Sequence, residues 1–256
     1  FSLSRGLGDV YKRQLQGGET LTMSGSGTAA SVNVANGIAM SSNGDLGLVD
    51  GTGLASNYSL NSTVINITQR VLNSSGSKIY DANTNALAAD ITLSNLVSGE
   101  TLNHSGTATL SSANAGSYTI SNLTGISIAD NAGLASNYTL TGGTHNFTVN
   151  PKVVSIQGNK TYDGNTTISS SDITSITGTV GSETLVMSSG TGTTSSQNAA
   201  TYASAGINEG SLTLGNGSNG GLAANYTLTG HAASSFQINQ RVLSSSGTRT
   251  YNGTTT

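Results

Sequence analysis

Cysteine and tryptophan are absent from the 256 residues, and Pro151 is the only proline. Without cysteine the chain can form neither a disulfide nor a thiolate metal site. Charged residues make up only 8% of the chain and the formal net charge is −3, whereas a nucleic-acid-binding surface needs clustered lysine and arginine to displace phosphate counterions. No run approaches the roughly 18 apolar residues of a membrane helix. We therefore expect no nucleic-acid partner and no membrane insertion.

Glycine, serine, threonine and asparagine dominate what remains, with 34 glycines but only 5% aromatic residues. Short alternating runs of Val, Ile, Thr and Tyr are typical of strands that have one solvated face and are joined by tight turns. Disordered chains instead carry high charge and few β-branched residues. No segment shows a sustained apolar period of 3.6, and turn signals recur at intervals of roughly 8 to 12 residues. The pattern predicts an all-β protein made of sandwich-like or small barrel-like domains.

One stretch, Lys-Thr-Tyr-Asp-Gly-Asn-Thr-Thr at 160–167, recurs in related form at 78–84 and 249–255. The tyrosines of the three copies are 82 and 89 positions apart, which is the length of a small domain and not of one solenoid coil. We predict tandem small β-sandwich-like modules in a row. A parallel β-helix or other solenoid is the alternative, and it requires a shorter internal period that the sequence does not contain.

Two further anchors keep their order in each repeat. Glu-Thr-Leu recurs at 19–21, 100–102 and 183–185, and Gly-Leu-Ala-x-Asn-Tyr recurs at 53–58, 133–138 and 221–226. Boundaries fall where one closing strand meets the next opening strand. The predicted organisation is a non-native leader at 1–14, a partial module at 15–68, modules at 69–150 and 151–239, and the start of a further module at 240–256, so that the chain is a fragment of an array.

Strands within a module are predicted from the second one. We expect Ile65 and Ile67, and likewise Phe147 and Val149, to share a buried face because alternate residues of a strand point the same way. The third module is longer, and we predict a loop insertion across 190–220. The predicted strands are 71–74, 77–80, 90–93, 107–111, 117–120, 125–128, 138–141 and 146–149.

Taken together, the Tyr-Asp-Gly stretch, Gly-Glu-Thr-Leu at 99–102, Ala-Gly-x-Tyr-Thr at 115–119 and Gly-Leu-Ala-x-Asn-Tyr-Thr-Leu make residues 15–256 resemble the YDG repeat domain. That domain occurs in filamentous-haemagglutinin-like, two-partner secreted exoproteins of Gram-negative bacteria. The resemblance implies a large surface adhesin exported by an outer-membrane transporter, with these repeats in its stalk. Ala82 and Asn252 depart from the signature, which argues against a strict chemical role for the triplet.

The tyrosines after Tyr11 all occupy repeated slots, which favours a structural role, with buried rings whose hydroxyls are tied to the backbone. Stacking on sugars is the functional alternative. A glutamate repeats as well, but a glycoside hydrolase needs a second carboxylate at a defined distance and none repeats beside it, so we predict an edge-strand or turn role. The tyrosines are Tyr58, Tyr80, Tyr118, Tyr138, Tyr162, Tyr202, Tyr226 and Tyr251, and the glutamates are Glu19, Glu100 and Glu183.

Asp81-x-Asn83-x-Asn85 resembles the opening of a calcium loop, and Asp163-x-Asn165 keeps half of it. Such a loop needs glycine at its sixth position and glutamate at its twelfth, where this chain has Ala86 and Thr92. We predict instead a turn that Asp and Asn side chains cap by bonding their own backbone.

Other motifs carry little chemistry. The Gly-x-Gly-x-x-Gly at 215–220 precedes no helix and no acidic residue follows it, so we predict a loop and not a nucleotide site. Glu209 is the only carboxylate of the predicted insertion. His104, His145 and His231 occupy unmatched positions, which argues against a metal site or triad. Asn-x-Ser/Thr sequons occur at Asn57, Asn66, Asn122, Asn137, Asn146, Asn165 and Asn225, as expected by chance in a chain this rich in Asn, Ser and Thr.

We expect a non-catalytic stalk fragment of a secreted or cell-surface adhesin, with no catalytic residue, metal or cofactor. The expected partners are host or environmental glycans or cell surfaces, with an outer-membrane transporter during export. The alternatives are spacer repeats of a secreted carbohydrate-active exoenzyme and a purely structural surface filament.

Overall fold

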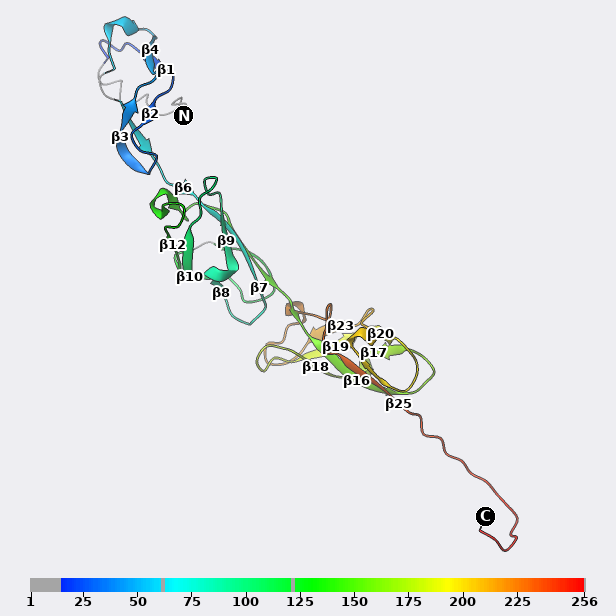
Figure 1. Ribbon diagram of the computed structural model, residues 1–256. Coiled ribbons are helices and arrows are strands. Elements are labelled where there is room, and N and C mark those ends of the chain that lie inside the picture. The colour runs from blue at the N-terminus through cyan, green and yellow to red at the C-terminus, as the bar shows by residue number, and fades with distance from the viewer. Residues whose placement is uncertain (1–14, 61–62, 121–122, 256) are drawn as a thin grey trace. The chain divides into compact units, whose positions relative to one another are not determined.

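The computed structural model describes residues 15–60, 63–120 and 123–255 (Figure 1). The predicted leader at 1–14 and the sequon at Asn122 lie outside these ranges. Within them the regular structure consists of strands and three-residue 3₁₀ turns, labelled η. No helix there has the length and apolar character needed to cross a membrane.

The chain divides into two compact units. Among the described residues, unit 1 contains 15–60, 63–74, 93–106 and 126–144, and unit 2 contains 75–92, 107–120, 123–125 and 145–255. The repeat at 69–150 contributes segments to both units. Unit 1 also contains the described part of the repeat at 15–68, and unit 2 also contains the repeat at 151–239.

Unit 1 contains small sheets, in which the strands are antiparallel except for one parallel pair. Strands β1 (Leu21–Ser24) and β4 (Gly47–Asp50) pair with each other, and β3 (Ala35–Ser42) lies between β2 (Thr28–Ala29) and β5 (Val64–Ile67). Strand β12 (Ile126–Ala129) pairs with the first half of β10 (Asn103–Thr109), and β6 (Arg70–Val71) pairs in parallel with β13 (Tyr138–Thr139). The 3₁₀ turns η1 (Ala55–Asn57) and η3 (Ala135–Asn137) occupy the two Gly-Leu-Ala anchors.

One core cluster of unit 1 forms around a tyrosine. Leu72, Leu102 and Tyr138 are buried together, and the side chains of Leu93, Leu96, Ile128 and Leu140 pack against them. Two of the three central residues belong to repeated anchors. The anchors therefore recur because they supply core residues, which a lean chain needs in order to bury enough apolar surface.

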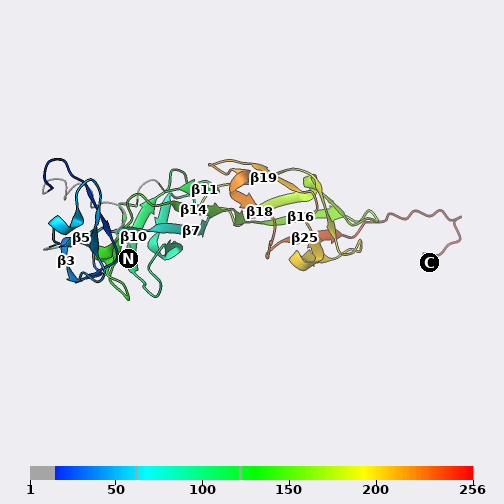
Figure 2. The same cartoon turned by 90° about the horizontal axis from the view of Figure 1, so that it is seen from above.

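Unit 2 contains the complete third repeat. A four-stranded sheet has the order β18 (Ile173–Thr177), β16 (Ser155–Thr161), β25 (Ser235–Asn239) and β21 (Thr201–Ala203), and β16 and β25 are parallel. Figure 2 shows β16 and β25 side by side. The smaller sheets of this repeat are β17 (Thr167–Ser169) with β20 (Thr191–Thr194) and β22 (Ile207–Asn208), β19 (Leu185–Ser189) with β23 (Thr213–Asn216), and β15 (Lys152–Val153) with β24 (Tyr226–Thr227). Its 3₁₀ turns are η4 (Ser170–Asp172), η5 (Ser204–Gly206) and η6 (Ala223–Asn225).

The second repeat has the same topology in its own four-stranded sheet. The order β9-β7-β14-β11 matches β18-β16-β25-β21 strand for strand. Here β7 is Asn73–Ile79, β9 is Ile91–Ser94, β11 is Gly116–Thr119 and β14 is His145–Asn150, and β8 (Asn85–Leu87) and η2 (Ala88–Asp90) lie between β7 and β9 in the sequence. The repeat in the sequence therefore corresponds to a repeated sheet topology.

A glycine in the motif strand lets a phenylalanine pack against bare backbone. A Cβ built on Gly158 would lie 2.4 Å from the Asp172 carbonyl oxygen and 3.0 Å from the ring of Phe236. At Gly76, its counterpart, a Cβ would lie 2.7 Å from the ring of Phe147. Both rings are almost fully buried, with 0% and 1% of their surface exposed. Each glycine therefore marks a close approach of ring and backbone.

The predicted fold class is confirmed, because the described residues form tandem all-β modules and no solenoid. Several details of the prediction are wrong. The segments 71–74 and 77–80 are not two equal strands, because β6 ends at Val71 and β7 runs continuously from Asn73 to Ile79. Strand β8 is missing from the prediction, and Ile67 is only half-buried. The predicted insertion loop at 190–220 contains β20 to β23 and η5.

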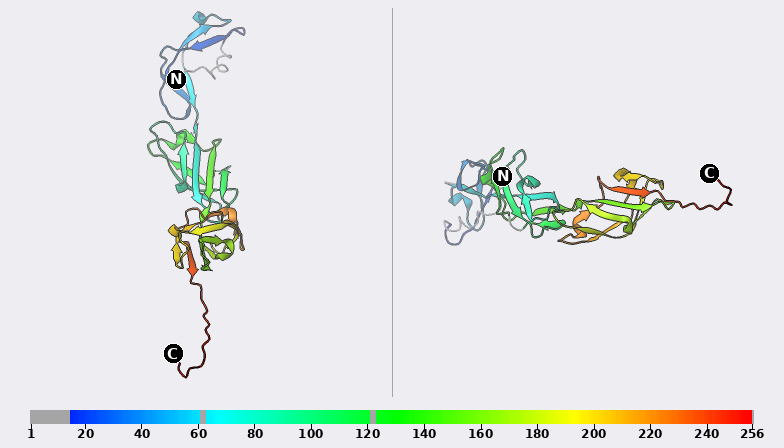
Figure 3. Two further views of the ribbon diagram at one scale, coloured as in Figure 1. Left: turned by 90° about the vertical axis from the view of Figure 1, so that its right-hand side faces the viewer. Right: turned by 90° about the horizontal axis from the view of Figure 1, so that it is seen from below.

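Residues 240–255 are exposed and form no strand (Figure 3). Val242, Leu243 and Tyr251 each expose close to nine-tenths of their surface. The domain boundaries proposed at 69, 151 and 240 remain a prediction.

The turn after the motif tyrosine requires a left-handed residue. Gly164 has φ +82°, and Ala82 holds the same position with φ +62°. Glycine adopts this region without strain, while a Cβ there costs about 1–2 kcal/mol. Ala82 therefore replaces the glycine of Tyr-Asp-Gly while the turn keeps the same left-handed conformation.

We expect Gly164→Ala to lower the free energy of unfolding by about 1 kcal/mol because it introduces a Cβ at positive φ. Ala82→Gly is the matched reverse change, and it should raise stability by about 0.5 kcal/mol, since relief of strain exceeds the added entropy of the unfolded chain. Urea unfolding followed by circular dichroism measures both. Changes of the same sign in the two variants would contradict a shared left-handed turn.

Candidate functional site

The motif turn is closed by its own side chains. The Asn83 amide N–H donates to Asp81 Oδ1 at 3.2 Å, and the Asn165 N–H donates to Asp163 Oδ1 at 3.1 Å. The same bond forms in the third copy, where the Thr254 N–H donates to Asn252 Oδ1 at 3.1 Å. The predicted side-chain-capped turn is therefore present in all three copies, although the residue at positive φ is Ala82, Gly164 or Gly253 and not asparagine.

A lysine ammonium fills the oxygen cluster that resembles a calcium loop. Lys160 Nζ lies 3.0 Å from Asp163 Oδ1 and donates to Asn165 Oδ1 at 2.8 Å and to the Thr167 carbonyl oxygen at 2.7 Å. Lys78 Nζ makes the matching bonds to Asp81 and Asn83, and both lysine side chains are at least nine-tenths buried. Hydrogen bonding to Lys160 lowers the pKa of the Asp163 carboxyl. The oxygens that would bind a cation are thus already paired with the protein's own cation.

The repeated glutamate is the partner of a repeated tyrosine. Tyr58 Oη donates to Glu19 Oε2 at 2.6 Å, and Tyr226 Oη donates to Glu183 Oε2 at 2.6 Å. Tyr138 makes the same bond to Glu100. The expected turn role of the glutamates is confirmed, because the N–H of each donates to the carbonyl oxygen three residues earlier, at 2.9 to 3.0 Å. The half-buried side chain has a further role that the sequence did not predict, as the acceptor for a phenol.

These tyrosine hydroxyls also accept a backbone N–H, as expected for a buried phenol. The donors are the N–H groups of Gln16, Val97 and Val180, at 3.2, 3.1 and 2.9 Å. The glutamate and this N–H together satisfy the hydroxyl. A stacking role on sugar is not available to Tyr138 or Tyr226, which expose 2% and 5% of their surface.

The glycine of the Gly-Leu-Ala anchor makes room for the glutamate side chain. A Cβ on Gly133 would lie 2.6 Å from Glu100 Oε2, and a Cβ on Gly53 would lie 2.7 Å from Glu19 Oε2. An acceptor at the end of the preceding strand then caps the 3₁₀ turn. Asp50 Oδ1 accepts from the Ala55 N–H at 2.6 Å, and Asp130 Oδ1 accepts from the Ala135 N–H at 2.7 Å.

Glu183 differs from the other two glutamates because it binds a second tyrosine from the preceding repeat. Tyr80 Oη donates to Glu183 Oε1 at 2.7 Å, while Tyr226 occupies Oε2. The rings of Tyr80 and Tyr226 meet edge to face, with centroids 5.4 Å apart and an interplanar angle of 77°. The tyrosine of the Tyr-Asp motif therefore packs onto the next repeat.

An asparagine side chain makes a second contact between repeats, and it does so twice. Asn225 Oδ1 accepts from the Ala115 N–H at 2.8 Å, and its Nδ2 donates to Asn114 Oδ1 at 3.0 Å. In unit 1, Asn137 Oδ1 accepts from the Val34 N–H at 2.9 Å, and its Nδ2 donates to Asn33 Oδ1 at 3.0 Å. Sequence reasoning treated these asparagines only as sequons.

A signal for this contact is present in the sequence. Asn33, Asn114 and Asn198 all stand two residues after a serine whose Oγ accepts their backbone N–H, at 3.0, 3.1 and 3.2 Å. The turn Ser-x-Asn therefore recurs once per repeat, in register with the asparagine of the Gly-Leu-Ala anchor. The two recurrences mark both partners of the contact, although they do not say which repeats it joins.

The asparagine contact also bears on glycosylation. Asn225 is 1% exposed and its Nδ2, the atom to which a sugar would attach, donates to Asn114. Asn137 uses its Nδ2 in the same way. A sugar at either position would require the contact to open, while Asn57, Asn66, Asn146 and Asn165 are exposed.

The remaining tyrosines behave in two ways. Tyr118 Oη donates to the Asn114 carbonyl oxygen at 2.6 Å, and Tyr202 Oη donates to the Asn198 carbonyl oxygen at 2.7 Å. The predicted tie between hydroxyl and backbone is confirmed for this pair. Tyr162 is only half-buried, and Tyr251 is 91% exposed.

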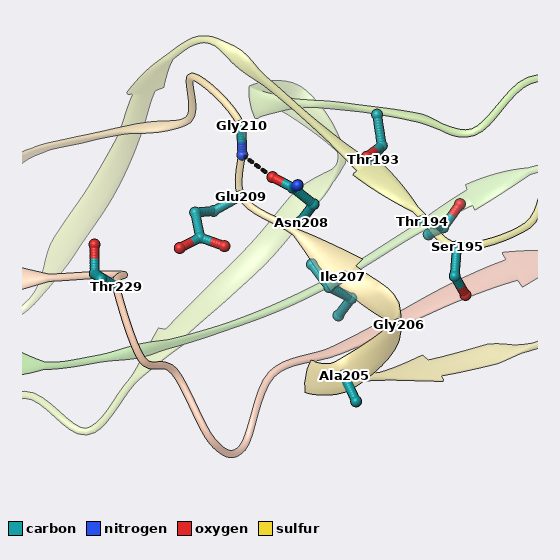
Figure 4. Close-up of a pocket in the computed structure, with 10 residues that line it drawn as sticks. All are labelled: Thr193, Thr194, Ser195, Ala205, Gly206, Ile207, Asn208, Glu209, Gly210 and Thr229. Atoms are coloured by element: carbon teal, nitrogen blue, oxygen red, sulfur yellow. Dashed lines mark hydrogen bonds between the residues drawn. The ribbon is translucent and has the colours of Figure 1, made fainter.

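A polar cavity of about 600 Å³ lies in the third repeat and is lined by Thr193, Thr194, Ser195, Ala205, Gly206, Ile207, Asn208, Glu209, Gly210 and Thr229. Figure 4 shows the Glu209 carboxylate extending toward the side where Thr229 lies. The Glu209 Oε2 atom is also 3.4 Å from His231 Nε2. The sequence shows Glu209 as the only carboxylate of the predicted insertion. The structure pairs it with His231, whose side chain is 5% exposed.

The arrangement of the His, Asp and Glu side chains bears on metal binding and acid–base catalysis. No group of three or more His, Cys, Asp or Glu residues that could hold a metal occurs among them. Glu209 is the one carboxylate among the residues that line the cavity, whereas glycoside hydrolysis uses a pair. The 215–220 motif begins at the end of β23 and precedes only the three-residue η6, so it binds no nucleotide in the manner of a Rossmann fold.

The paired tyrosines predict a stability loss at alkaline pH. Burial and the bond to Glu183 raise the pKa of both Tyr80 and Tyr226 to about 12, against about 10 in an unfolded chain. Between those values the unfolded chain loses phenol protons that the folded chain keeps. Stability is therefore fully present below pH 10 and is lost as the pH rises toward 12.

Melting temperatures measured from pH 9 to 12 test this expectation. Tyr80→Phe should flatten the decline because it removes one of the two raised groups. Absorbance at 295 nm should show a fraction of the phenols ionising near pH 12. An unchanged slope in Tyr80→Phe would contradict the assignment.

The strands, the repeated topology and the recurring Tyr–Glu and Asn contacts define a modular all-β protein whose repeats pack through matching residues. The chain belongs to the YDG domain family, whose model matches residues 66–146 and 144–235, well over half of the chain. No curated protein and no solved structure matches the chain.

Proposed function

We propose that this chain is a non-catalytic segment of repeats from an adhesin that a Gram-negative bacterium secretes or displays on its surface. The observation that carries the proposal is the recurrence of one structural constellation. The same glutamate accepts from the same tyrosine in three successive repeats, at Glu19, Glu100 and Glu183. A carboxylate engaged in this way in every repeat supports the module and is not available for acid–base chemistry.

Export by a dedicated outer-membrane transporter belongs to the same proposal, as does binding to glycans or cell surfaces. Many weak contacts multiplied along an array can give useful avidity without any tight site. The cavity at Glu209 and Thr229 offers hydroxyl, amide and carboxylate groups to a hydroxyl-rich ligand. Its polar lining supports contact with a sugar more than with an apolar ligand.

Binding of the fluorescently labelled full chain to intact cells and to a glycan array tests adhesion. Saturable binding is expected, and Glu209→Ala should weaken it if the cavity takes part. Thr213→Ala, an exposed change outside the cavity lining, is the matched control. Binding no greater than that of an inert protein on every surface would overturn the adhesive role.

Two further measurements separate the alternatives. Release of reducing ends from polysaccharides by the full chain would overturn the non-catalytic assignment. Protease treatment of intact cells of the source bacterium should remove the protein if it lies on the surface. Full protection in intact cells, with cleavage after lysis, would contradict that location.

A further inference from the structure

A lysine, an aspartate and an asparagine side chain meet at the motif turn of two repeats. In the second repeat, Lys78 Nζ donates to Asp81 Oδ1 at 2.8 Å and to Asn83 Oδ1 at 2.9 Å. Asn83 Nδ2 donates to the other carboxylate oxygen, Asp81 Oδ2, at 2.7 Å. One carboxylate therefore contacts both the amine of the lysine and the amide nitrogen of the asparagine. We call this set of three side chains the amine–amide cluster.

The third repeat contains the same cluster. Lys160 Nζ lies 3.0 Å from Asp163 Oδ1 and donates to Asn165 Oδ1 at 2.8 Å. Only 8% of the Lys78 side chain and 7% of the Lys160 side chain are exposed. Each amine is therefore held against an amide group instead of being surrounded by water, and a fixed approach of two reactive groups greatly raises their rate of reaction.

The asparagine carbonyl of each cluster also accepts a backbone N–H. The Asn85 N–H donates to Asn83 Oδ1 at 2.8 Å, and the Thr167 N–H donates to Asn165 Oδ1 at 2.9 Å. An N–H aimed at a carbonyl oxygen stabilises the negative charge that the oxygen gains when a nucleophile attacks its carbon. Each cluster thus combines a nucleophile, an electrophilic carbon, a carboxylate that can move a proton, and a donor for the developing charge.

We propose that Lys78 and Asn83, and likewise Lys160 and Asn165, become joined by an isopeptide bond. From the resting ion pair the carboxylate accepts a proton of the lysine ammonium, and the neutral amine then attacks the asparagine Cγ. The Nζ–Cγ bond forms and the Cγ–Nδ2 bond breaks. Two protons pass from Nζ to the leaving nitrogen, which departs as an ammonium ion, and the carboxylate is regenerated. No oxidant, reductant or other reactant is needed.

The copy of the motif at 249–255 lacks all three of these side chains. Arg249, Asn252 and Thr254 stand where the second and third repeats have lysine, aspartate and asparagine. A guanidinium keeps its proton in proteins and is therefore no nucleophile. The groups that the reaction requires are thus present together in two copies and absent together in the third.

The bond would tie the end of β7 to the turn before β8, and the end of β16 to the turn before β17. The chain has no cysteine and so no disulfide to restrict its unfolded state. An isopeptide bond supplies a constraint of the same kind and cannot be reduced. This inference goes beyond the proposed function and does not rest on it.

Intact-mass spectrometry of the purified full chain tests the proposal. We expect a mass about 34 Da below that of the unmodified polypeptide, because each site loses one NH₃ of about 17 Da. Lys160→Arg keeps the positive charge and should show a loss of only about 17 Da, as should Asn165→Ala. Lys152→Arg changes a lysine outside both clusters, and this matched control should keep the full loss. Asp163→Ala should slow the loss at the third repeat severalfold, since it removes the group that moves the protons.

Tryptic mapping of the denatured chain locates the bond. Trypsin does not cleave after a lysine whose amine is in an amide bond, so cleavage should fail after Lys78 and Lys160 and proceed after Lys152. A loss of ammonia that leaves Lys78 and Lys160 cleavable would reveal succinimide formation and overturn the proposal. A wild-type mass equal to that of the unmodified polypeptide would overturn it as well, whether or not any variant folds and whether or not the chain binds a cell or a glycan.

Discussion

Phe236→Ala is expected to lower the free energy of unfolding of unit 2 by about 4 kcal/mol, in the range measured for buried phenylalanine to alanine changes. Phe236 is 0% exposed and lies on the central strand β25, between β16 and β21. Its ring packs against Gly158, where no side chain is available to move into the space. Because the surrounding strands are tied by backbone hydrogen bonds, the cavity can collapse only in part.

Urea unfolding of the full chain, followed by circular dichroism, measures this loss. Phe236→Leu is the matched control and should cost about 1 kcal/mol, since it retains most of the apolar volume. Phe147→Ala should resemble Phe236→Ala because it occupies the same slot and is 1% exposed. A cost below about 1 kcal/mol for Phe236→Ala would show that the ring does not support the sheet.

Glu183→Ala is expected to cost about 3 kcal/mol, because it leaves two buried phenols without their acceptor at about 1–3 kcal/mol each. Tyr80 and Tyr226 expose 4% and 5% of their surface, so water cannot readily replace the carboxylate. The three repeats provide a graded comparison. Glu100→Ala leaves only Tyr138 without its acceptor and should cost about half as much. Glu19→Ala should cost least because Tyr58 is half-buried.

Thermal and urea unfolding of the three alanine variants measures this order. Glu183→Gln is the control of conserved size and should fall between wild type and Glu183→Ala, since an amide oxygen can accept from only one of the phenols at full strength. Equal losses in all three alanine variants would show that the second tyrosine contributes nothing. A loss confined to Glu100→Ala would contradict the role of Tyr80 in joining repeats.

Much of the fold is predictable from the sequence because the repeat shows each slot more than once. The alternation of Phe147 and Val149 predicts a strand with one buried face, and both side chains are 1% exposed. The capped turn at Asp81 is also predictable, because Asx bonding is local and needs only residues two positions apart. Strand β8 was missed since Asn85, Ala86 and Leu87 have no strong β propensity and are held by pairing with β10.

The candidate site was harder to predict because its partners are far apart in sequence. Tyr80 and Glu183 are 103 positions apart, and Asn114 and Asn225 are 111 apart. Periodicity identifies a repeated residue but does not say whether its partner lies in the same repeat or in the next. The sequence also could not show that the Asp163 and Asn165 oxygens, which resemble part of a calcium loop, are already paired. Only the folded chain places the Lys160 ammonium among them.

The sequence by itself determined that this protein is all-β, repeats a unit of about 80 residues, and has a side-chain-capped turn in each copy of the motif. These properties follow from local conformational preference and from the period of apolar residues, which act over a few positions. Only the tertiary structure decided that the glutamate accepts from tyrosine, that Tyr80 and Asn225 join neighbouring repeats, and that Glu209 pairs with His231. Those contacts depend on burial and on the meeting of distant strands, where an unpaired polar group is costly and a partner must be found in space.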